Sequence, residues 1–230
     1  MEIRLASLLG GAEQATGVVG IIDVFRAFST AAAALAHGAS NIIMVSEVEE
    51  ALAMRANGVG QLVMGEVAGR APDGFDFGNS PLEASRFDVR GKTIIQRTSA
   101  GTQGIAAAAQ ADRLYAAALV TATATARCMR AGYPTQVTLV AMGKNARERT
   151  DEDELCALHL RNLLQGRPGN REAVRQVILA GGEAARFFDA SRPYLHREDL
   201  EIALDIDRYD FAIRVRSEDG RAVARMERPG

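Results

Sequence analysis

Short, uninterrupted apolar runs alternate with alanine-rich stretches along the first two-thirds of the chain, and this alternation constrains the fold most strongly. The run VVGIIDV at residues 18–24, for example, is followed by AFSTAAAALAHG. Strands that are apolar throughout are typical of a parallel sheet with both faces covered, and the intervening helices supply that cover. The predicted strands span residues 18–24, 41–46, 61–65, 92–98, 112–119 and 135–143.

The last third of the chain has a different pattern. Residues 150–200 are predicted to be helical, with segments such as DEDELCALHLRNLLQG and REAVRQVILAGGEAARFFDA. Segments 211–216 and 221–227 follow, and the Asp-Gly pair between them favours a hairpin turn. The sequence therefore predicts an antiparallel hairpin near the C-terminus.

No linker, low-complexity tract or internal repeat divides the sequence, and 230 residues suffice for one large domain. We expect a single domain over residues 1–230, with a three-layer α/β/α fold and a mostly parallel central sheet. The helical segment at about 150–200 would be followed by closing strands at about 201–228, of which EIALDI at 201–206 is the first.

Charge and aromatic content exclude one class of partner. The net charge is −2, the isoelectric point is near 6.0, and no basic run is present. Only 5% of the residues are aromatic and there is no tryptophan, so a surface that stacks bases is not expected. We predict that the protein has no nucleic-acid partner. The alanine-rich, weakly charged helices are compatible with a homodimer.

The sequence also argues against a membrane partner and a zinc site. The N-terminal residues have neither the apolar run nor the cleavage pattern of a signal peptide, and no segment has the apolar length of a membrane span. We therefore expect a cytoplasmic protein. Cys128 and Cys156 are not spaced as metal ligands and are expected to be packed thiols.

The stretch GFDFGNSPLE has a helix start at its end. Ser80 fits the N-cap position, Pro81 the first helical position, and Glu83 the third position of a capping box. A similar cap is expected at Ser46 with Glu49. The loop that precedes Ser80 is long, and long loops in compact domains are often functional or disordered. The segment is thus either a helix start only or a helix start that faces a ligand.

Polar residues follow several of the predicted strands. In open parallel sheets, ligands bind beyond the carboxyl ends of the strands, so these residues are the candidate site. They include Asp23, Arg26, Glu66, Asn79, Ser80, Thr98, Ser99, Gly101, Thr102, Lys144, Asn145, Glu152 and Asp153.

Asp23 and Arg26 allow two interpretations. A carboxylate at the end of a buried strand is costly unless it is paired or binds a metal, and Arg26 is the simplest local partner for an ion pair. Alternatively, Asp23 is a metal ligand or a nucleophile, and Arg26 holds an anion through its planar fork.

Two further segments have both a local and a functional interpretation. RTSAGT precedes a helix, where backbone N–H groups could hold a phosphate, although the lysine and glycine spacing of a P-loop are missing. Thr150 and Asp153 could form a capping box, or Glu152 and Asp153 could bind a metal. Carboxylates beside cations and helix starts suit Mg²⁺ next to a phosphate, so phosphoryl chemistry is favoured over acyl transfer.

Several of these segments, in this order, resemble the 2-phosphosulfolactate phosphatase family over about residues 18–165. The segments are IDVFRAFST, MGEVAG, GFDFGNSPLE, RTSAGT and TDEDELCA. The resemblance implies a Mg²⁺-dependent phosphatase with a three-layer α/β fold that acts on phosphate esters of α-hydroxy acids, notably on the route to coenzyme M. Its substrate would be a small phosphorylated molecule.

Applied to this sequence, the resemblance suggests roles for the candidate residues. The catalytic residues would be Asp23, Arg26 and Glu66, and Mg²⁺ would be held by Asp23, Glu152 and Asp153. The substrate would be bound by Asn79, Ser80, Thr98, Ser99, Gly101 and Thr102.

This sequence departs from the family pattern at positions suited to anion binding. Val67 stands where the family has an arginine, and Ala100 where it has an asparagine. The residues after Arg26 read Ala-Phe-Ser-Thr in place of a threonine run. The departures predict either a substrate with fewer anionic groups or a non-catalytic protein that binds a phosphorylated metabolite. A purely structural role without a ligand is a third reading.

Overall fold

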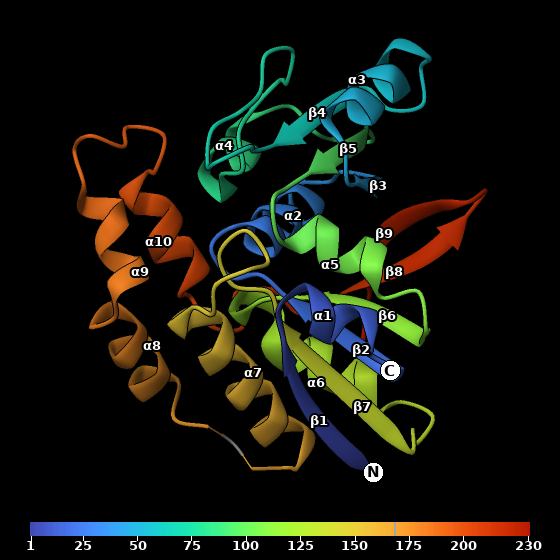
Figure 1. Ribbon diagram of the computed structural model, residues 1–230, viewed down its shortest axis with the longest axis vertical. Coiled ribbons are helices and arrows are strands. Elements are labelled where there is room, and N and C mark those ends of the chain that lie inside the picture. The colour runs from blue at the N-terminus through green and yellow to red at the C-terminus, as the bar shows by residue number, and fades with distance from the viewer. Residues whose placement is uncertain (168) are drawn as a thin grey trace.

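The computed structural model describes residues 1–167 and 169–230. Across these residues, nine strands form one sheet in the order β1-β7-β2-β6-β8-β9-β3-β5-β4 (Figure 1). The strands are β1 (Glu2–Ser7), β2 (Gly17–Ile22), β3 (Asn41–Val45), β4 (Leu62–Gly65), β5 (Thr93–Arg97), β6 (Ala111–Ala117), β7 (Gln136–Ala141), β8 (Ala212–Glu218) and β9 (Arg221–Glu227).

Helices connect most of these strands. They are α1 (Leu8–Glu13), α2 (Ala27–Ala36), α3 (Val48–Ala56), α4 (Pro81–Arg86), α5 (Gly101–Ala107), α6 (Ala122–Arg130), α7 (Asp151–Leu164), α8 (Arg171–Leu179), α9 (Gly182–Ala185) and α10 (Arg197–Ala203), with 3₁₀ turns at Leu119–Thr121 and Arg186–Phe188. The predicted α/β fold, with its mostly parallel sheet and C-terminal antiparallel hairpin, is confirmed.

The hairpin β8–β9 lies in the middle of the sheet and not at an edge. β8 pairs antiparallel with β6, and β9 pairs antiparallel with β3. The hairpin therefore joins two parallel groups, β1-β7-β2-β6 and β3-β5-β4, which run in opposite directions along the sheet order. The last strands of the chain thus join the two groups into one sheet.

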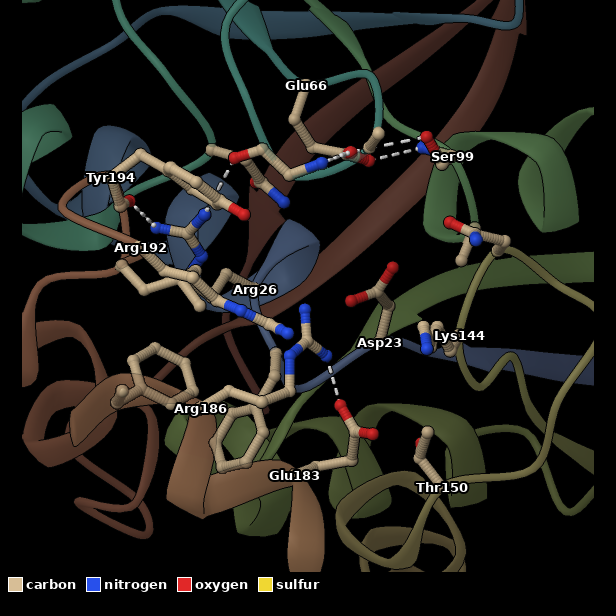
Figure 2. A pocket seen from close by; sticks show the side chains of 18 of the residues that line it. Asp23, Arg26, Glu66, Ser99, Lys144, Thr150, Glu183, Arg186, Arg192 and Tyr194 are labelled. Atoms are coloured by element: carbon tan, nitrogen blue, oxygen red, sulfur yellow. Dashed lines mark hydrogen bonds and ion pairs between the residues drawn. The ribbon is translucent and has the colours of Figure 1, made fainter. Parts of the chain in front are cut away.

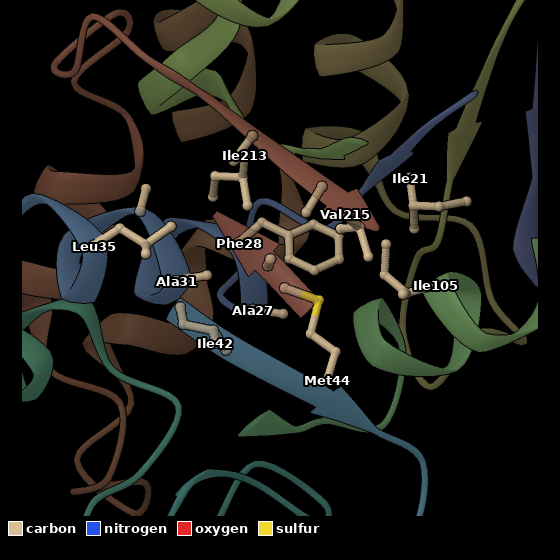
Figure 3. Packing of buried hydrophobic residues seen from close by; sticks show 14 of the residues in the cluster. Ile21, Ala27, Phe28, Ala31, Leu35, Ile42, Met44, Ile105, Ile213 and Val215 are labelled. Atoms are coloured by element: carbon tan, nitrogen blue, oxygen red, sulfur yellow. The ribbon is translucent and has the colours of Figure 1, made fainter. Parts of the chain in front are cut away.

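Helices α2 and α5 lie between the two strand groups (Figure 1). Every residue of α2 from Ala27 to Leu35 is buried, which explains its alanine content, because a helix enclosed on all sides needs small side chains. Phe28 fills the centre of this layer, among side chains from both strand groups and the hairpin (Figure 3). Helix α3 packs on the outer face of β3, β4 and β5, and helices α6 and α7 pack on the outer face of the other group.

Two sequence predictions were wrong about elements. Strand β1 was not predicted, because EIRLAS carries charges and has no buried residue, as is common for an edge strand. Residues 201–206 are not a strand: they complete α10 and the turn after it. Ile202, Leu204 and Ile206 alternate as in a strand, but Leu200, Ala203 and Leu204 are buried with helical spacing, and Ile206 is buried in the turn after α10.

The predicted helix caps were partly right. Ser80 Oγ accepts a hydrogen bond from the Glu83 amide at 3.1 Å, as a cap should. The Glu83 carboxylate accepts from the Gly78 amide at 2.7 Å and does not return to Ser80. Helix α3 begins after Glu47, so the predicted cap at Ser46 was wrong.

The remaining global predictions concern thiols and membranes. Cys128 and Cys156 are buried free thiols, as predicted. In the part of the chain that the structure describes, no helix is both long enough and apolar enough to span a bilayer.

Candidate active site

A cleft of about 450 Å³ opens where strands of both groups end (Figure 2). Residues that follow β2 and β7 line it, together with residues that follow β4 and β5. The carboxyl ends of the two groups therefore face the same cleft, although the groups run in opposite directions along the sheet. The polar lining residues are Asp23, Arg26, Glu66, Arg70, Asn79, Ser99, Lys144, Asn145, Thr150, Glu152, Glu183, Arg186, Ser191, Arg192 and Tyr194.

Asp23 is a buried carboxylate held by backbone amides. Its Oδ1 accepts from the Ala27 amide at 3.1 Å and its Oδ2 from the Gly101 amide at 2.8 Å. Burial raises the pKa of Asp23 to about 6, and the negative charge of Glu66 adds to this effect. Its predicted ion pair with Arg26 is absent from the salt bridges of the described residues, because backbone N–H groups satisfy the carboxylate.

Glu152 and Asp153 begin α7 and have different surroundings. Asp153 accepts from the amides of Val24 and Gly143, both at 2.8 Å, so the predicted capping box with Thr150 was wrong. Burial and the charge of Asp23 raise the pKa of Asp153 well above its usual value. Glu152 lines the cleft, 3% exposed, and burial with the charge of Asp153 raises its pKa to about 10.

Three buried oxygens of cleft-lining side chains have no hydrogen-bond partner among residues 1–167 and 169–230. They are Asn79 Oδ1, Thr150 Oγ1 and Glu152 Oε2. Most buried polar atoms in proteins are paired, so an unpaired set at one cleft indicates a site for a ligand or a cation. Oxygen donors of this kind, beside a carboxylate, are the ligands that Mg²⁺ prefers.

Mg²⁺ differs from zinc in how many of its coordinating ligands the protein supplies. In the described residues, no group of three His, Cys, Asp or Glu side chains is arranged to hold a metal. Mg²⁺ is commonly bound through one or two carboxylates, with waters and substrate phosphate oxygens completing the shell. Asp23 and Glu152, which share the cleft, therefore fit Mg²⁺.

Glu66 holds two loops together. Its Oε1 accepts from the Ser99 amide at 2.6 Å, and its Oε2 accepts from the Gly69 amide at 2.7 Å and the Ser99 hydroxyl at 3.2 Å. The carboxylate thus joins the loop after β4 to the turn after β5. The geometry shows Glu66 shaping the cleft wall, with both oxygens engaged.

In the turn before α5, which was predicted to hold a phosphate, three backbone amides are engaged within the protein. The amides of Ser99, Gly101 and Thr102 donate to Glu66, Asp23 and Thr98 Oγ1, respectively. A Cβ at Gly101 would lie 2.9 Å from Asp23 Oδ2 and 2.9 Å from the Ala27 Cβ, so only glycine fits there. The turn binds carboxylates of the protein and leaves few donors for a phosphate.

Arg26 is paired with a residue that the sequence did not indicate. Its Nη1 donates to Asp199 Oδ2 at 2.7 Å and to the Tyr194 carbonyl at 3.1 Å, and its Nη2 donates to the Gly69 carbonyl at 3.4 Å. Asp199 is fully buried, and its Oδ1 accepts from the Ser80 hydroxyl at 2.7 Å. Ser80 therefore supports Arg26 from behind and does not line the cleft.

The candidate residues divide into those that line the cleft and those behind it. Ser80, Thr98, Gly101, Thr102 and Asp153 do not line it, whereas the other predicted residues do. Lys144 and Asn145, which were expected after the sixth strand, also line the cleft. Three cations that line it were not predicted, because they follow no recognised motif: Arg70, Arg186 and Arg192.

The two departures from the family pattern lie in different places. Val67 is 43% exposed and is not among the residues that line the cleft, whereas Ala100 lines it. Arg70, three residues after Val67, lines the cleft with its guanidinium 4.6 Å from the centre of the Tyr194 ring. The loop after β4 therefore still provides an arginine to the cleft, at position 70.

The fold and the cleft define an α/β protein in which carboxylates and arginines lie together beyond the carboxyl ends of parallel strands. Such an arrangement suits an anionic ligand and a divalent cation. Sequence comparison narrows this class. The sequence model of the 2-phosphosulpholactate phosphatase family matches residues 7–217, and the chain belongs to that family.

Curated proteins from several bacteria are similar to the chain, and each is named "Probable 2-phosphosulfolactate phosphatase". The Thermotoga petrophila protein is 40% identical over 127 residues, covering 55% of this chain and 54% of that protein, so the match spans about half of the relative. The Thermus thermophilus protein is 35% identical over 153 residues, or 66% and 64% of the two chains. The Bacillus subtilis protein is 28% identical over 202 residues, or 86% of each.

Proposed function

We propose that this chain is a Mg²⁺-dependent phosphatase that hydrolyses a phosphate monoester of a small hydroxy acid, 2-phosphosulfolactate or a related compound. Family membership supports the class of reaction. One observation carries the proposal: among the described residues, Asn79, Thr150 and Glu152 each have a buried oxygen without a partner at the cleft that also contains Asp23. These oxygens need a cation or a ligand to satisfy them.

Asp23 and Glu152 are the carboxylates that would hold Mg²⁺, and the oxygens of Asn79 and Thr150 are available to the ion or its waters. Mg²⁺ supplies a positive charge that binds phosphate oxygens and offsets the charge of the transferring phosphoryl group. Asp153 has a positioning role. It accepts hydrogen bonds from the amides of Val24 and Gly143, which are next to Asp23 and Lys144 in sequence. These bonds fix the chain after β2 and after β7.

Arg26 and Lys144 are the cations that we assign to the phosphate. A guanidinium has five N–H donors, and Asp199, Tyr194 and Gly69 accept three hydrogen bonds from Arg26. Arg26 lines the cleft, so its remaining donors are available to a phosphate. Lys144 also lines the cleft (Figure 2), and its ammonium lies 3.8 Å from Glu148 Oε2 in an exposed ion pair. Both residues would bind and orient the phosphate, and the surrounding walls would exclude water from it.

The test is phosphate release from a panel of esters, with Mg²⁺ or with EDTA. The panel contains 2-phosphosulfolactate, 2-phospholactate, phosphoglycerate and p-nitrophenyl phosphate. We expect release that depends on Mg²⁺ and is lost in Asp23→Asn. Asp112→Asn is the matched control, because Asp112 is exposed and does not line the cleft. Release in EDTA, or full activity in Asp23→Asn, would contradict the proposal.

The alternative is a non-catalytic protein that binds a phosphorylated metabolite with the same fold. The observation in its favour is Ala100, which lines the cleft and has no group to bind an anionic oxygen. It predicts that the esters raise the unfolding temperature in the presence of Mg²⁺ while no phosphate is released. Measuring both quantities on the same samples separates the two functions.

A further inference from the structure

One wall of the cleft comes from the segment between α8 and α10, outside the sheet. We call it the C-terminal wall. Arg186 and Arg192 belong to this segment, and both line the cleft. Figure 2 shows their guanidinium groups pointing into the cleft, toward Asp23. Two positive charges therefore converge on the space opposite the carboxylates of the sheet.

Each of these arginines is held by a carboxylate from its own segment. Arg186 is paired with Glu183, and Arg192 Nε lies 3.1 Å from Asp189 Oδ2. One carboxylate does not use all five donors of a guanidinium. Arg186 Nε is buried and has no partner among the described residues. The side chains are 30% and 39% exposed, so an entering ligand can reach both.

The position of the two arginines separates them from the groups assigned to the phosphate. Those groups are Arg26 and Lys144, and they lie on the same side of the cleft as the proposed Mg²⁺ ligands Asp23 and Glu152. We call this side, which residues at the ends of the strands form, the sheet wall. A cleft of about 450 Å³ is in the range of pockets that bind small organic ligands, roughly 300–1,000 Å³. The opposite wall would therefore meet the organic part of a phosphate ester. Two converging guanidinium groups favour an anionic group at that end.

We infer that Arg186 and Arg192 are specificity-determining residues that bind a second anionic group of the substrate, a carboxylate or sulfonate on its carbon skeleton. The inference rests on the proposed function, in which the phosphate occupies the sheet wall. In the competing reading, Arg186 and Arg192 only stabilise their segment through the ion pairs with Glu183 and Asp189. The two readings differ in how substitution affects substrates with and without the second anion.

The experiment compares 2-phospholactate with isopropyl phosphate, in which a methyl group replaces the carboxylate. A third ester, 2-phosphosulfolactate, tests the sulfonate. The variants are Arg186→Gln and Arg192→Gln, and the matched control is Arg130→Gln, because Arg130 is exposed at the end of α6. Unfolding temperatures establish that each variant is folded.

We expect Arg186→Gln and Arg192→Gln to lower kcat/KM for 2-phospholactate about 10- to 100-fold, the range for losing a charged hydrogen bond. The values for isopropyl phosphate should stay within about twofold. A greater loss with 2-phosphosulfolactate than with 2-phospholactate would show that the sulfonate is the bound group. Equal losses for all three esters, or no loss for any, would overturn the inference.

Binding measurements keep the inference testable if the protein does not hydrolyse these esters. Calorimetry with Mg²⁺ then gives the affinity of the unsubstituted protein and of Arg192→Gln for 2-phospholactate and isopropyl phosphate. A preference for 2-phospholactate that is lost in Arg192→Gln supports the second-anion site although catalysis has failed. Equal affinity of the unsubstituted protein for both esters, or no binding of either, overturns it.

Discussion

The two walls of the cleft are built by different means. At the sheet wall, three buried carboxylates each accept backbone amides from two places in the chain: Asp23 from Ala27 and Gly101, Glu66 from Gly69 and Ser99, and Asp153 from Val24 and Gly143. On the C-terminal wall, Arg186 and Arg192 are held by partly exposed ion pairs with near neighbours in sequence.

This difference suggests a division of labour. Backbone amides fix the carboxylates at the ends of strands, and a rigid support of this kind suits groups that hold a metal and a reacting phosphate. The ion pairs of Arg186 and Arg192 are partly exposed, and pairs of this kind contribute little stability. Residues of this wall can therefore differ between proteins that bind different substrates. The buried ion pair between Arg26 and Asp199 connects the two walls.

The largest effect is expected for Asp199→Asn. The variant keeps an oxygen for the Ser80 hydroxyl and the Leu82 amide but removes the negative charge that faces Arg26. Breaking a buried ion pair by removing one charge typically costs about 3–5 kcal/mol. We expect a loss of that size in the free energy of unfolding, measured by urea denaturation, together with weaker phosphate binding.

Asp205→Asn provides the control for this prediction. Asp205 forms an ion pair with Arg208 at 2.8 Å, but both side chains are largely exposed. Exposed pairs contribute at most about 1 kcal/mol. If the two variants lose equal stability, the Arg26–Asp199 contact is not the link between the walls that we infer.

Gly101→Ala is expected to have the next largest effect, on the sheet wall alone. The added Cβ would lie 2.9 Å from Asp23 Oδ2, the Ala27 Cβ and the Phe28 ring, so the turn or the carboxylate must move. Overpacking typically costs about 1–3 kcal/mol. Activity should fall more than stability, because Asp23 is displaced. Gly182→Ala is the control: no atom lies within 4 Å of its added Cβ.

The sequence predicted the sheet wall better than the C-terminal wall. Asp23, Glu66, Asn79 and Glu152 follow strands or begin helices that apolar patterning reveals, and the rule about carboxyl ends brought them together before their contacts were known. The rule does not give their partners. Arg26 pairs with Asp199, 173 residues away, where only tertiary structure brings the charges together.

The C-terminal wall had no comparable signal. Arg186 lies in a 3₁₀ turn and Arg192 in the loop that follows it, neither within a motif, and arginines in such segments are usually solvated. The hairpin was recognised from its Asp-Gly turn, but its central place in the sheet depends on pairing with β3 and β6. Local patterns report which residues form a strand and not which strands lie on either side of it.

A smaller effect is expected for Ser80→Ala, which tests the support behind Arg26. The variant loses the cap of α4 and the hydrogen bond to Asp199 but leaves the Arg26–Asp199 pair in place. Loss of a serine cap typically costs about 1 kcal/mol. Thermal unfolding should show this decrease, while kcat/KM falls less than in Asp199→Asn. The reverse order would mean that Ser80 itself contacts the substrate.

The smallest effect is expected for Val67→Arg, which restores a family residue outside the cleft. Val67 is 43% exposed, and Arg70 from the same loop already lines the cleft, so a new arginine at position 67 adds little. We expect kcat/KM to change less than about twofold. Ala100→Asn is the informative comparison, because Ala100 lines the cleft and an amide there can reach the ligand. Steady-state kinetics with 2-phosphosulfolactate and 2-phospholactate should therefore show a change in substrate preference for Ala100→Asn alone. A larger change for Val67→Arg would show that the loop after β4 reaches the substrate, and the sheet wall would then share in selection.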